Sequence, residues 1–307
     1  GDWSRIIRLA TSTYSWPPDA GKPAIAVDSS NSVGIIWRVM NEHPQEKVLK
    51  YFKFDSQGRK LAEKILKTQG VCSWPAIVLD GLGNVNIIWT EESKEGEQRI
   101  IYTNLDDANN KVLERNLTRY SAKADQVALQ IDDKDNLHLV WRNDKAGSIR
   151  LYYLIVDKKG KNVGGAREAS NDTCCSFPNL ILDSSGNVHI AYWARKTNAW
   201  ELRYTVLNPS DMHVLKTMTL GNSVTLKEYN RPSLALDSNG KTHVVWTEQF
   251  ESARVHISSI SYAIIDDEKN KLTENILVSD KAGWPSIAID SHDQIQITWT
   301  DWRTGKM

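Results

Sequence analysis

Three features that would place a protein in a narrow class are missing from this sequence. Its 38 basic and 38 acidic side chains cancel, so it has no electrostatic footprint for DNA or RNA. No apolar stretch reaches the ~20 residues that a membrane-spanning helix needs. The three cysteines, Cys72, Cys174 and Cys175, are too few for a disulfide framework and lack zinc-ligand spacing. We therefore expect no nucleic-acid partner, no membrane insertion, no metal and no other cofactor.

The chain does contain an internal repeat. Six segments align on an aspartate, and the steps between successive aspartates are 52, 52, 51, 54 and 53 residues; the aspartates are Asp28, Asp80, Asp132, Asp183, Asp237 and Asp290. An aromatic residue follows nine positions later in every copy, namely Trp37, Trp89, Trp141, Tyr192, Trp246 and Trp299. Six matches at near-constant spacing establish the repeat. We expect the tryptophan rings to be buried between repeats, where large flat side chains fill the widening space.

Each copy has the pattern of β-hairpins. In the second copy Val85, Ile87 and Trp89 alternate on one face, as in a half-buried strand. The turn from Asp80 to Gly83 combines an aspartate that caps the turn with a glycine that supplies a positive φ. A tyrosine marks a second hairpin in the first five copies, at Tyr51, Tyr102, Tyr153, Tyr204 and Tyr262. Each unit is therefore predicted to have four antiparallel strands.

Four-stranded units repeated around an axis predict an all-β fold, a six-bladed β-propeller in one domain over residues 1–307. The sixth copy stops soon after Trp299 and has no tyrosine-bearing hairpin. The last blade is therefore predicted to be incomplete, although Ser4 to Leu9 has the pattern of a fourth strand. A further segment of a longer chain is the favoured way to complete the blade. A strand from a neighbouring chain and an irregular blade are the alternatives.

The repeat Pro-x-Ile-Ala-x-Asp-x-x-Gly-x-x-His-Ile-x-Trp resembles that of secreted bacterial and archaeal β-propellers grouped with sialidase-like and NHL-like repeat proteins. The resemblance covers nearly the whole chain and implies the architecture, because a fold does not carry a function with it. The sialidase Asp-box, Ser-x-Asp-x-Gly-x-Thr-Trp, has a different spacing. Gly21-Lys22-Pro23 stands where sialidases carry Arg-Ile-Pro. No sialidase catalytic residue therefore transfers, and we identify no catalytic residue from the sequence.

The position before the first-strand proline, or its equivalent, gives the first candidate ligand-binding residues. It lies at the face that carries the loops between strands 4 and 1 and between strands 2 and 3, where loops vary on a fixed scaffold. This position alternates between the aromatic residues Trp74, Phe177 and Trp284 and the polar or basic residues Lys22, Gln126 and Arg231. We expect the three rings to form a partly exposed triangle that stacks on sugars or on an apolar partner. The alternative is that they cover the seams between blades.

The residues just after strand 2 give a second set of candidates near the mouth of the central channel. Arg38, Arg142 and Arg195 suit a carboxylate or sulfate ligand, and the set also holds Glu91, Glu248 and Asp301. Two such carboxylates could serve as acid and base in glycoside cleavage, but Glu91 and Glu248 fall on opposite blades. A solvated rim of salt bridges is the alternative.

Three histidines share one repeat position, at His138, His189 and His243. The other copies place Gly34, Asn86 and Gln296 there, and a position that accepts glycine is not a metal ligand. Structural packing is the predicted role.

Together these patterns favour a non-catalytic extracellular or cell-surface module that recognises a glycan or a protein partner through its loop-rich face. A sialidase-like glycoside hydrolase or polysaccharide lyase is the alternative, and a structural unit of a surface array is a further one. Arginine, glutamate and tyrosine side chains converging at the channel mouth would favour the enzyme.

Overall fold

The computed structural model describes the chain in eight ranges, which are residues 23–40, 47–66, 68–118, 123–226, 230–252, 255–266, 271–278 and 280–301. These ranges hold 22 β-strands in six antiparallel sheets. None of these residues lies in a helix with the length and apolar character that crossing a bilayer requires.

The first five sheets have four strands each, in chain order. The first two consist of β1 (Ala24–Val27), β2 (Val33–Met40), β3 (Lys47–Phe54) and β4 (Lys60–Leu66), and of β5 (Val71–Leu79), β6 (Val85–Glu92), β7 (Gln98–Leu105) and β8 (Lys111–Asn116). The third and fourth consist of β9 (Lys123–Ile131), β10 (Leu137–Lys145), β11 (Ser148–Val156) and β12 (Asn162–Glu168), and of β13 (Cys175–Leu182), β14 (Val188–Lys196), β15 (Ala199–Leu207) and β16 (Val214–Ser223). The last two consist of β17 (Ser233–Leu236), β18 (Thr242–Ser252), β19 (Val255–Asp266) and β20 (Lys271–Val278), and of β21 (Ala282–Ile289) and β22 (Ile295–Asp301).

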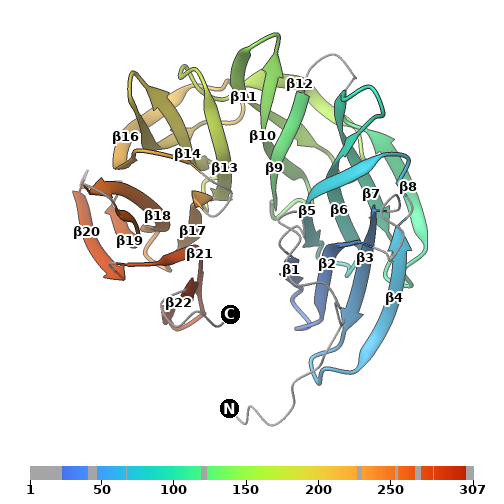
Figure 1. The fold of residues 1–307 in the computed structure, drawn as a ribbon. Helices are drawn as coiled ribbons and strands as arrows, with labels where there is room; N and C mark the ends of the chain where they lie inside the picture. Colours follow the sequence, from blue (N-terminus) through green and yellow to red (C-terminus); the bar gives the residue numbers. More distant parts are fainter. Residues whose placement is uncertain are drawn as a thin grey trace.

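The six sheets are arranged as blades around a common axis (Figure 1). The first strand of each blade is the innermost, because β1, β5, β9, β13, β17 and β21 contact one another in succession. The sheet of β1 and the sheet of β21 lie at the two ends of the arc (Figure 1). The predicted six-bladed β-propeller is confirmed, and the last blade has two strands among the described residues. Ser4 to Leu9 lie outside the described residues.

The hydrophobic core consists of separate clusters in the seams between blades. One cluster joins blades 2 and 3, and comparable clusters fill the seams on either side of it. Trp89, Trp141 and Trp246 are fully buried, as predicted. The prediction is wrong for Trp299, which is 39% exposed, and Trp37 is only half-buried. The cluster between blades 5 and 6 has only three buried members, so it does not extend over Trp299.

The aspartate turns join the first two strands of every blade. In each turn one aspartate oxygen accepts backbone N–H bonds from the residues two and four positions later; for Asp80 these come from Leu82 (3.0 Å) and Asn84 (2.8 Å). The same pattern holds from Asp28 to Asp290. These turns lie at the ends of the blades opposite the loops that join strand 4 to strand 1.

The repeated histidines tie the turns to the third strands. His138 Nε2 lies 3.3 Å from Asp132 Oδ2, and its Nδ1 lies 2.5 Å from the Tyr153 hydroxyl. Since a carboxylate only accepts, Nε2 carries the proton and Tyr153 donates to Nδ1. His189 and His243 make the same two contacts in their own blades. Within the described ranges no three His, Cys, Asp or Glu side chains are grouped as metal ligands.

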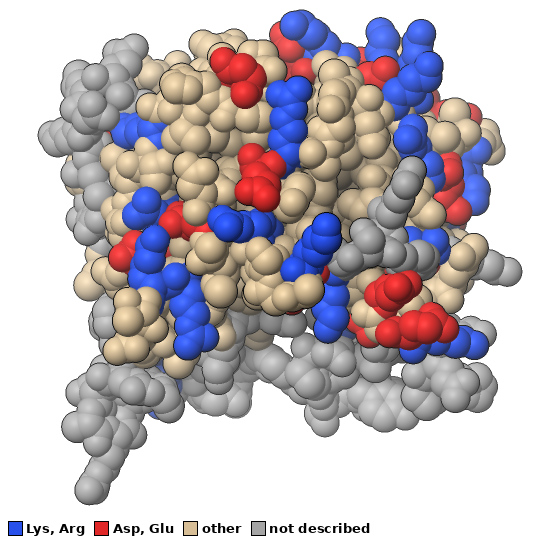
Figure 2. Space-filling model, turned by 90° about the horizontal axis from the view of Figure 1, so that it is seen from above, with Lys and Arg blue, Asp and Glu red and all other residues tan. Residues whose placement is uncertain are grey.

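Charges of both signs are interspersed over the face of the molecule in Figure 2. This face therefore presents no field of one sign, in line with the zero net charge.

Candidate functional site

The position before the first-strand proline is a strained bulge in four blades. Trp74, Gln126, Phe177 and Trp284 have φ angles of 52°, 54°, 53° and 51°, in the left-handed region. The strand pairing shifts register at each of them. Bulky residues rarely adopt this conformation, which costs about 1–3 kcal/mol each. Because such bulges re-aim side chains next to functional sites, four equivalent ones mark this end of the axis as the place to look for a site.

Side chains from four different blades meet at the bulges. The rings of Trp74 and Phe177 lie 6.0 Å apart, and Gln126 Oε1 accepts the backbone N–H of Phe177 at 2.6 Å. The Arg231 guanidinium lies 5.7 Å from the centre of the Trp74 ring. Residues of blades 2, 3, 4 and 5 can touch in this way only near the axis, so we call these four residues the axis cluster.

The axis cluster replaces the expected triangle of exposed rings. Phe177 is 7% exposed, because Trp74 packs against it across the axis, so its expected exposure is wrong. Trp74 and Trp284 are half-buried. Lys22 lies outside the described residues.

The predicted arginines have different environments. Arg142 forms a bidentate ion pair with Asp125, with Nε at 2.7 Å and Nη2 at 2.5 Å from the two carboxylate oxygens. Arg38 is buried and donates from Nη1 to the Cys72 carbonyl at 3.1 Å. Arg195 is exposed, and its guanidinium lies 5.8 Å from the centre of the Trp200 ring.

The two predicted glutamates have separate hydrogen-bond partners. Glu91 pairs with Arg99 at 2.5 Å and accepts the backbone N–H of Gln69 at 3.0 Å. Glu248 accepts the Trp246 Nε1–H at 2.8 Å. Asp301 is half-buried at the end of β22. Glu91 and Glu248 thus have separate partners, and nothing in these contacts makes them an acid–base pair.

A glycine makes room for Glu248. A Cβ atom on Gly221 would stand 2.0 Å from Glu248 Oε1 and 2.7 Å from Trp246 Nε1. No side chain fits at Gly221 while Glu248 keeps its place, so this carboxylate of blade 5 is held against β16 of blade 4, where Asn222 also donates its backbone N–H to Oε1 at 3.3 Å.

Asp125 is the acidic residue that the sequence reasoning missed. It precedes Gln126 directly and is buried in the bidentate pair with Arg142. Burial raises the pKa of Asp125 above its ordinary value, although Arg142 works in the opposite direction. A signal was present in the sequence, because the same repeat column otherwise holds uncharged residues: Gly21, Ser73, Ser176, Asn230 and Gly283.

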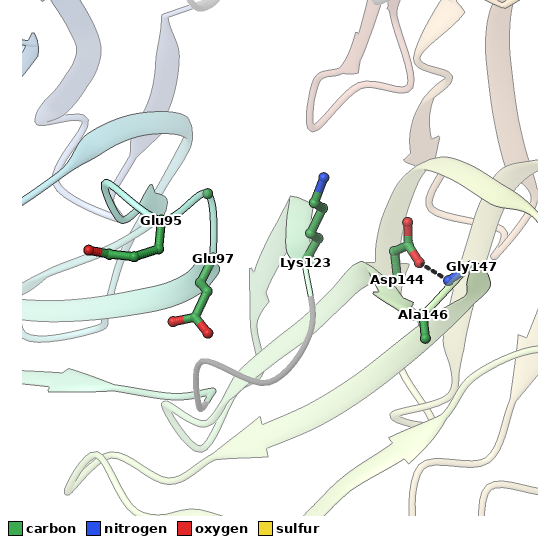
Figure 3. Close-up of a pocket in the computed structure, with 7 residues that line it drawn as sticks. Glu95, Glu97, Lys123, Asp144, Ala146 and Gly147 are labelled. Atoms are coloured by element: carbon green, nitrogen blue, oxygen red, sulfur yellow. Dashed lines mark hydrogen bonds between the residues drawn. The ribbon is translucent and has the colours of Figure 1, made fainter.

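A cleft of about 450 Å³ opens on the loop-rich face beside Asp125. Glu95 and Glu97 of the β6–β7 loop stand on one side, Asp144 stands on the other, and Lys123 lies between them (Figure 3). Lys123 and Asp144 are cross-strand partners two residues further along from Asp125 and Arg142. Because side chains two residues apart in a strand share a face, Asp125 lies on the same face of β9 as Lys123, although it does not itself line the cleft. The volume is within the range of small-molecule sites.

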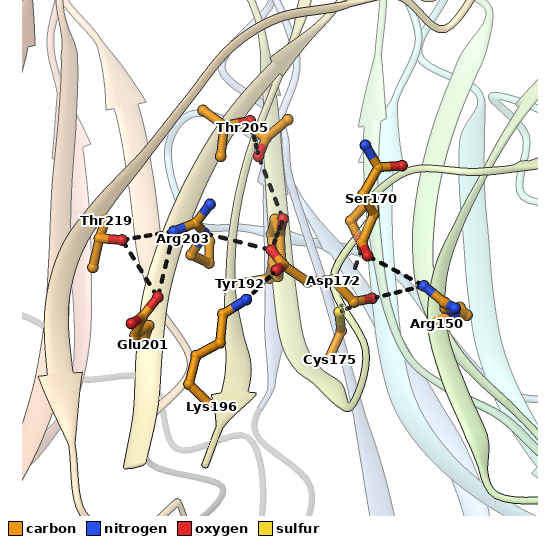
Figure 4. A network of polar contacts seen from close by, with 12 residues as sticks. Arg150, Ser170, Asp172, Cys175, Tyr192, Lys196, Glu201, Arg203, Thr205 and Thr219 are labelled. Carbon is orange, nitrogen blue, oxygen red and sulfur yellow. Dashed lines mark hydrogen bonds and ion pairs between the residues drawn. The ribbon is translucent and has the colours of Figure 1, made fainter. Parts of the chain in front are cut away.

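A second polar network lies in blade 4 and in the loop before it (Figure 4). Asp172 accepts the Tyr192 hydroxyl at 2.9 Å and lies 2.9 Å from Lys196 Nζ and 3.4 Å from Arg203 Nε. Burial opposes ionisation, but these partners hold the pKa of Asp172 below its ordinary value. A carboxyl whose pKa is lowered stays ionised, which suits anchoring of the β12–β13 loop better than proton transfer.

Comparison with known proteins adds information about the fold. No family model matches the chain, and no curated protein sequence matches it. Several solved structures are similar. The GH93 α-L-arabinofuranosidase of Fusarium graminearum in complex with arabinobiose has a TM-score of 0.63 at 8% identity, over 92% of this chain and 89% of that one.

Two other similar structures are also of glycan-active enzymes. A PL25 ulvan lyase bound to -[GlcA(1-4)Rha3S]- has a TM-score of 0.56 at 12% identity, over 92% of this chain and 74% of that one. The Hadza microbial sialidase Hz136 has a TM-score of 0.58 at 9% identity, over 93% of this chain and 66% of that one. The chain is therefore similar in fold to β-propeller glycan-active enzymes.

These structures correct the expectation of a non-catalytic binding module. The similar propellers are glycoside hydrolases and a polysaccharide lyase, which favours the enzymatic alternative. Identities of 8–12% establish the fold alone, so the activity of this chain is argued below from its own residues.

Proposed function

We propose that the protein is a glycan-cleaving enzyme, a glycoside hydrolase or polysaccharide lyase, whose substrate lies over the loop-rich face beside the propeller axis. The observation that carries the proposal is Asp125. It is a buried carboxyl with a raised pKa, next in sequence to Gln126 of the axis cluster and two residues along β9 from Lys123, which lines the cleft. Carboxyl groups perturbed in this way beside a cleft are candidates for proton transfer.

The chemistry follows from the environment of Asp125. Cleavage of a glycosidic bond requires a proton on the leaving oxygen, and a carboxyl whose pKa is raised by burial is suited to donate it. Arg142 fixes the orientation of the carboxyl through two parallel hydrogen bonds. Asp144 raises the pKa of Asp125 further through its charge, after burial as the main cause.

The surroundings fit a sugar chain. The half-buried ring of Trp74 belongs to the axis cluster together with Gln126, which follows Asp125 directly, and aromatic faces stack on sugar rings. Lys123, Glu95 and Glu97 on the cleft side offer polar groups to hydroxyls. Since polysaccharides are found outside cells and on their surfaces, we propose an extracellular or cell-surface location.

A cleavage screen tests the proposal. Neutral and acidic polysaccharides would be incubated with the protein, with new reducing ends reporting both reactions and unsaturated uronates reporting a lyase. Turnover is expected on at least one substrate class. It should fall about 100-fold or more in Asp125→Asn, the usual range for loss of a general acid or base. Turnover that survives this substitution would remove Asp125 from the proposal.

A further inference from the structure

Arg231 is a cation of the axis cluster that has no acidic partner among the described residues. Its Nη2 donates to the carbonyls of Val127 (2.9 Å) and Pro178 (3.2 Å), which belong to blades 3 and 4. The Trp74 ring lies against the guanidinium. Within the part of the chain that the structure describes, two neutral carbonyls and one ring are all that contact this charge. Burial lowers the pKa of Arg231 to about 10.

Three other arginines with largely buried side chains are each paired with an acid. Arg142 has Asp125, Arg99 has Glu91, and Arg203 has Asp172. Burying a cation without an acidic partner costs free energy because the charge loses its hydration. Arg231 therefore carries an uncompensated charge in the folded protein. An anion that arrives from solution would supply the missing charge.

Arg38 also lacks an acid among the described residues, but it is closed to ligands. Its side chain is buried, and its Nε is a buried donor with no partner. Arg231 differs because its side chain is only partly buried and none of its nitrogens is a buried donor without a partner among the described residues. Nη2 already donates to the two carbonyls, so Nε–H and Nη1–H, which point in different directions, are left to donate single charge-assisted hydrogen bonds to an oxygen of a carboxylate or sulfate.

The neighbours of Arg231 are preorganised. Trp74 and Phe177 are fixed by left-handed bulges, and Gln126 braces the Phe177 backbone. A guanidinium held between rigid strands loses little freedom on binding, which favours affinity for a small anionic group.

We infer that Arg231 forms an oxyanion site at the propeller axis, which holds a carboxylate or sulfate group of an acidic glycan. This rests on the proposed function, whose substrate class it specifies. The acidic unit binds at Arg231, and the neighbouring part of the glycan extends over Asp125 toward the cleft.

Binding of small probes tests the site. Glucuronate and glucose 6-sulfate would be titrated into the full chain at low and high salt, with glucose as the neutral control. We expect binding of one or both anions that weakens with salt and falls tenfold or more in Arg231→Gln, whose amide can still donate to the two carbonyls. Loss of binding to only one anion identifies carboxylate or sulfate as the ligand group. Arg167→Gln, which removes an exposed arginine of β12, the outermost strand of blade 3, is the matched control and should bind normally.

A second measurement, on the wild-type protein, tests the site even if Arg231→Gln has a lowered melting temperature. In the wild-type protein, glucuronate or the sulfate should shift the NMR signal of the Arg231 Nε–H, whereas glucose should not. Unshifted Arg231 signals at saturating anion, or a well-folded Arg231→Gln that binds both anions normally, overturn the inference.

Failure here is distinguishable from failure of the enzyme proposal. If Arg231→Gln cleaves a neutral glycan at the wild-type rate, the enzyme stands and the oxyanion site fails. If no glycan is cleaved but the anions bind through Arg231, the oxyanion site stands and the enzyme fails.

Discussion

At the scale of single residues, the environment of each ionisable group decides what it can do. Asp125 and Asp172 are both paired with cations, yet burial dominates at Asp125 and raises its pKa, whereas hydrogen bonds and cations prevail at Asp172 and lower its pKa. The first carboxyl is therefore the one suited to carry a proton. The repeat column of Asp125 otherwise holds uncharged residues, so the sequence marks this position as unusual. The burial of Asp125 and its bidentate pair with Arg142 depend on the fold and could not be predicted from the sequence.

Arg142 should set the pH dependence of the reaction. A general acid must be protonated, so kcat/KM should fall as pH rises through the pKa of Asp125. Removing the cation with Arg142→Met leaves burial unopposed, so the pKa of Asp125 rises further and the alkaline limb of the profile should move to higher pH. The pH profiles of the two proteins check this, with melting curves to confirm folding. A limb that stays in place would show that Asp125 does not carry the titrating proton.

The cysteines should differ in reactivity. Burial raises the pKa of Cys72 to about 11 and that of Cys175 to about 12, while Cys174 is half-buried. All three are free thiols. Because the thiolate is the reactive form, a disulfide reagent at pH 8 should modify Cys174 alone in the native protein and all three thiols after denaturation. Cys174→Ser should abolish the native reaction, and rapid labelling of Cys175 would contradict the assignment.

At the scale of the elements, the aspartate turns were readable from the sequence because their chemistry is local. A turn needs only the aspartate acceptor and a residue that tolerates positive φ, as Asp80 and Gly83 show. The bulges at Trp74 and Phe177 were not readable, since bulky residues in the left-handed region are held there by the packing of other blades.

The Asp–His–Tyr link in blade 3 predicts a pH-dependent stability. Burial lowers the pKa of His138, so the folded state binds its proton more weakly than the unfolded chain, whose pKa is about 6.5. The contribution of His138 is therefore complete above about pH 6.5 and is lost as pH falls below it. Asn86 occupies the same position in blade 2 and accepts the Tyr102 hydroxyl at 2.7 Å. Urea unfolding at pH 7.5 and 5.5 should show a smaller acid loss for His138→Asn; equal losses would argue against this role.

The seams between blades predict that replacing equivalent tryptophans with alanine lowers the free energy of unfolding by unequal amounts. Trp141 is 2% exposed in the seam between blades 2 and 3, so Trp141→Ala should cost about 3–5 kcal/mol. Trp299 occupies the same repeat position but is exposed, so Trp299→Ala should cost only about 1 kcal/mol. Chemical denaturation of the two variants provides the comparison. Similar losses would mean that the seam does not determine the contribution of the ring.

At the scale of the whole molecule, the repeat predicted the propeller fold but not the function of the protein. Blade number and the short last blade follow from spacing, because each unit must bury its faces against its neighbours. The axis cluster depends on side chains from four blades, which no single repeat reveals. The proposal of an enzyme therefore rests on the environment of Asp125.

Turnover on the glycan found by the screen is the most direct test of the enzyme proposal. Wild type, Asp125→Asn and Leu82→Ser would be compared at equal concentration; Leu82 is exposed in an aspartate turn on the opposite face. We predict cleavage by wild type and Leu82→Ser, and a rate about 100-fold or more lower for a normally folded Asp125→Asn. Equal rates for all three proteins, or no cleavage of any glycan by wild type, would contradict the account.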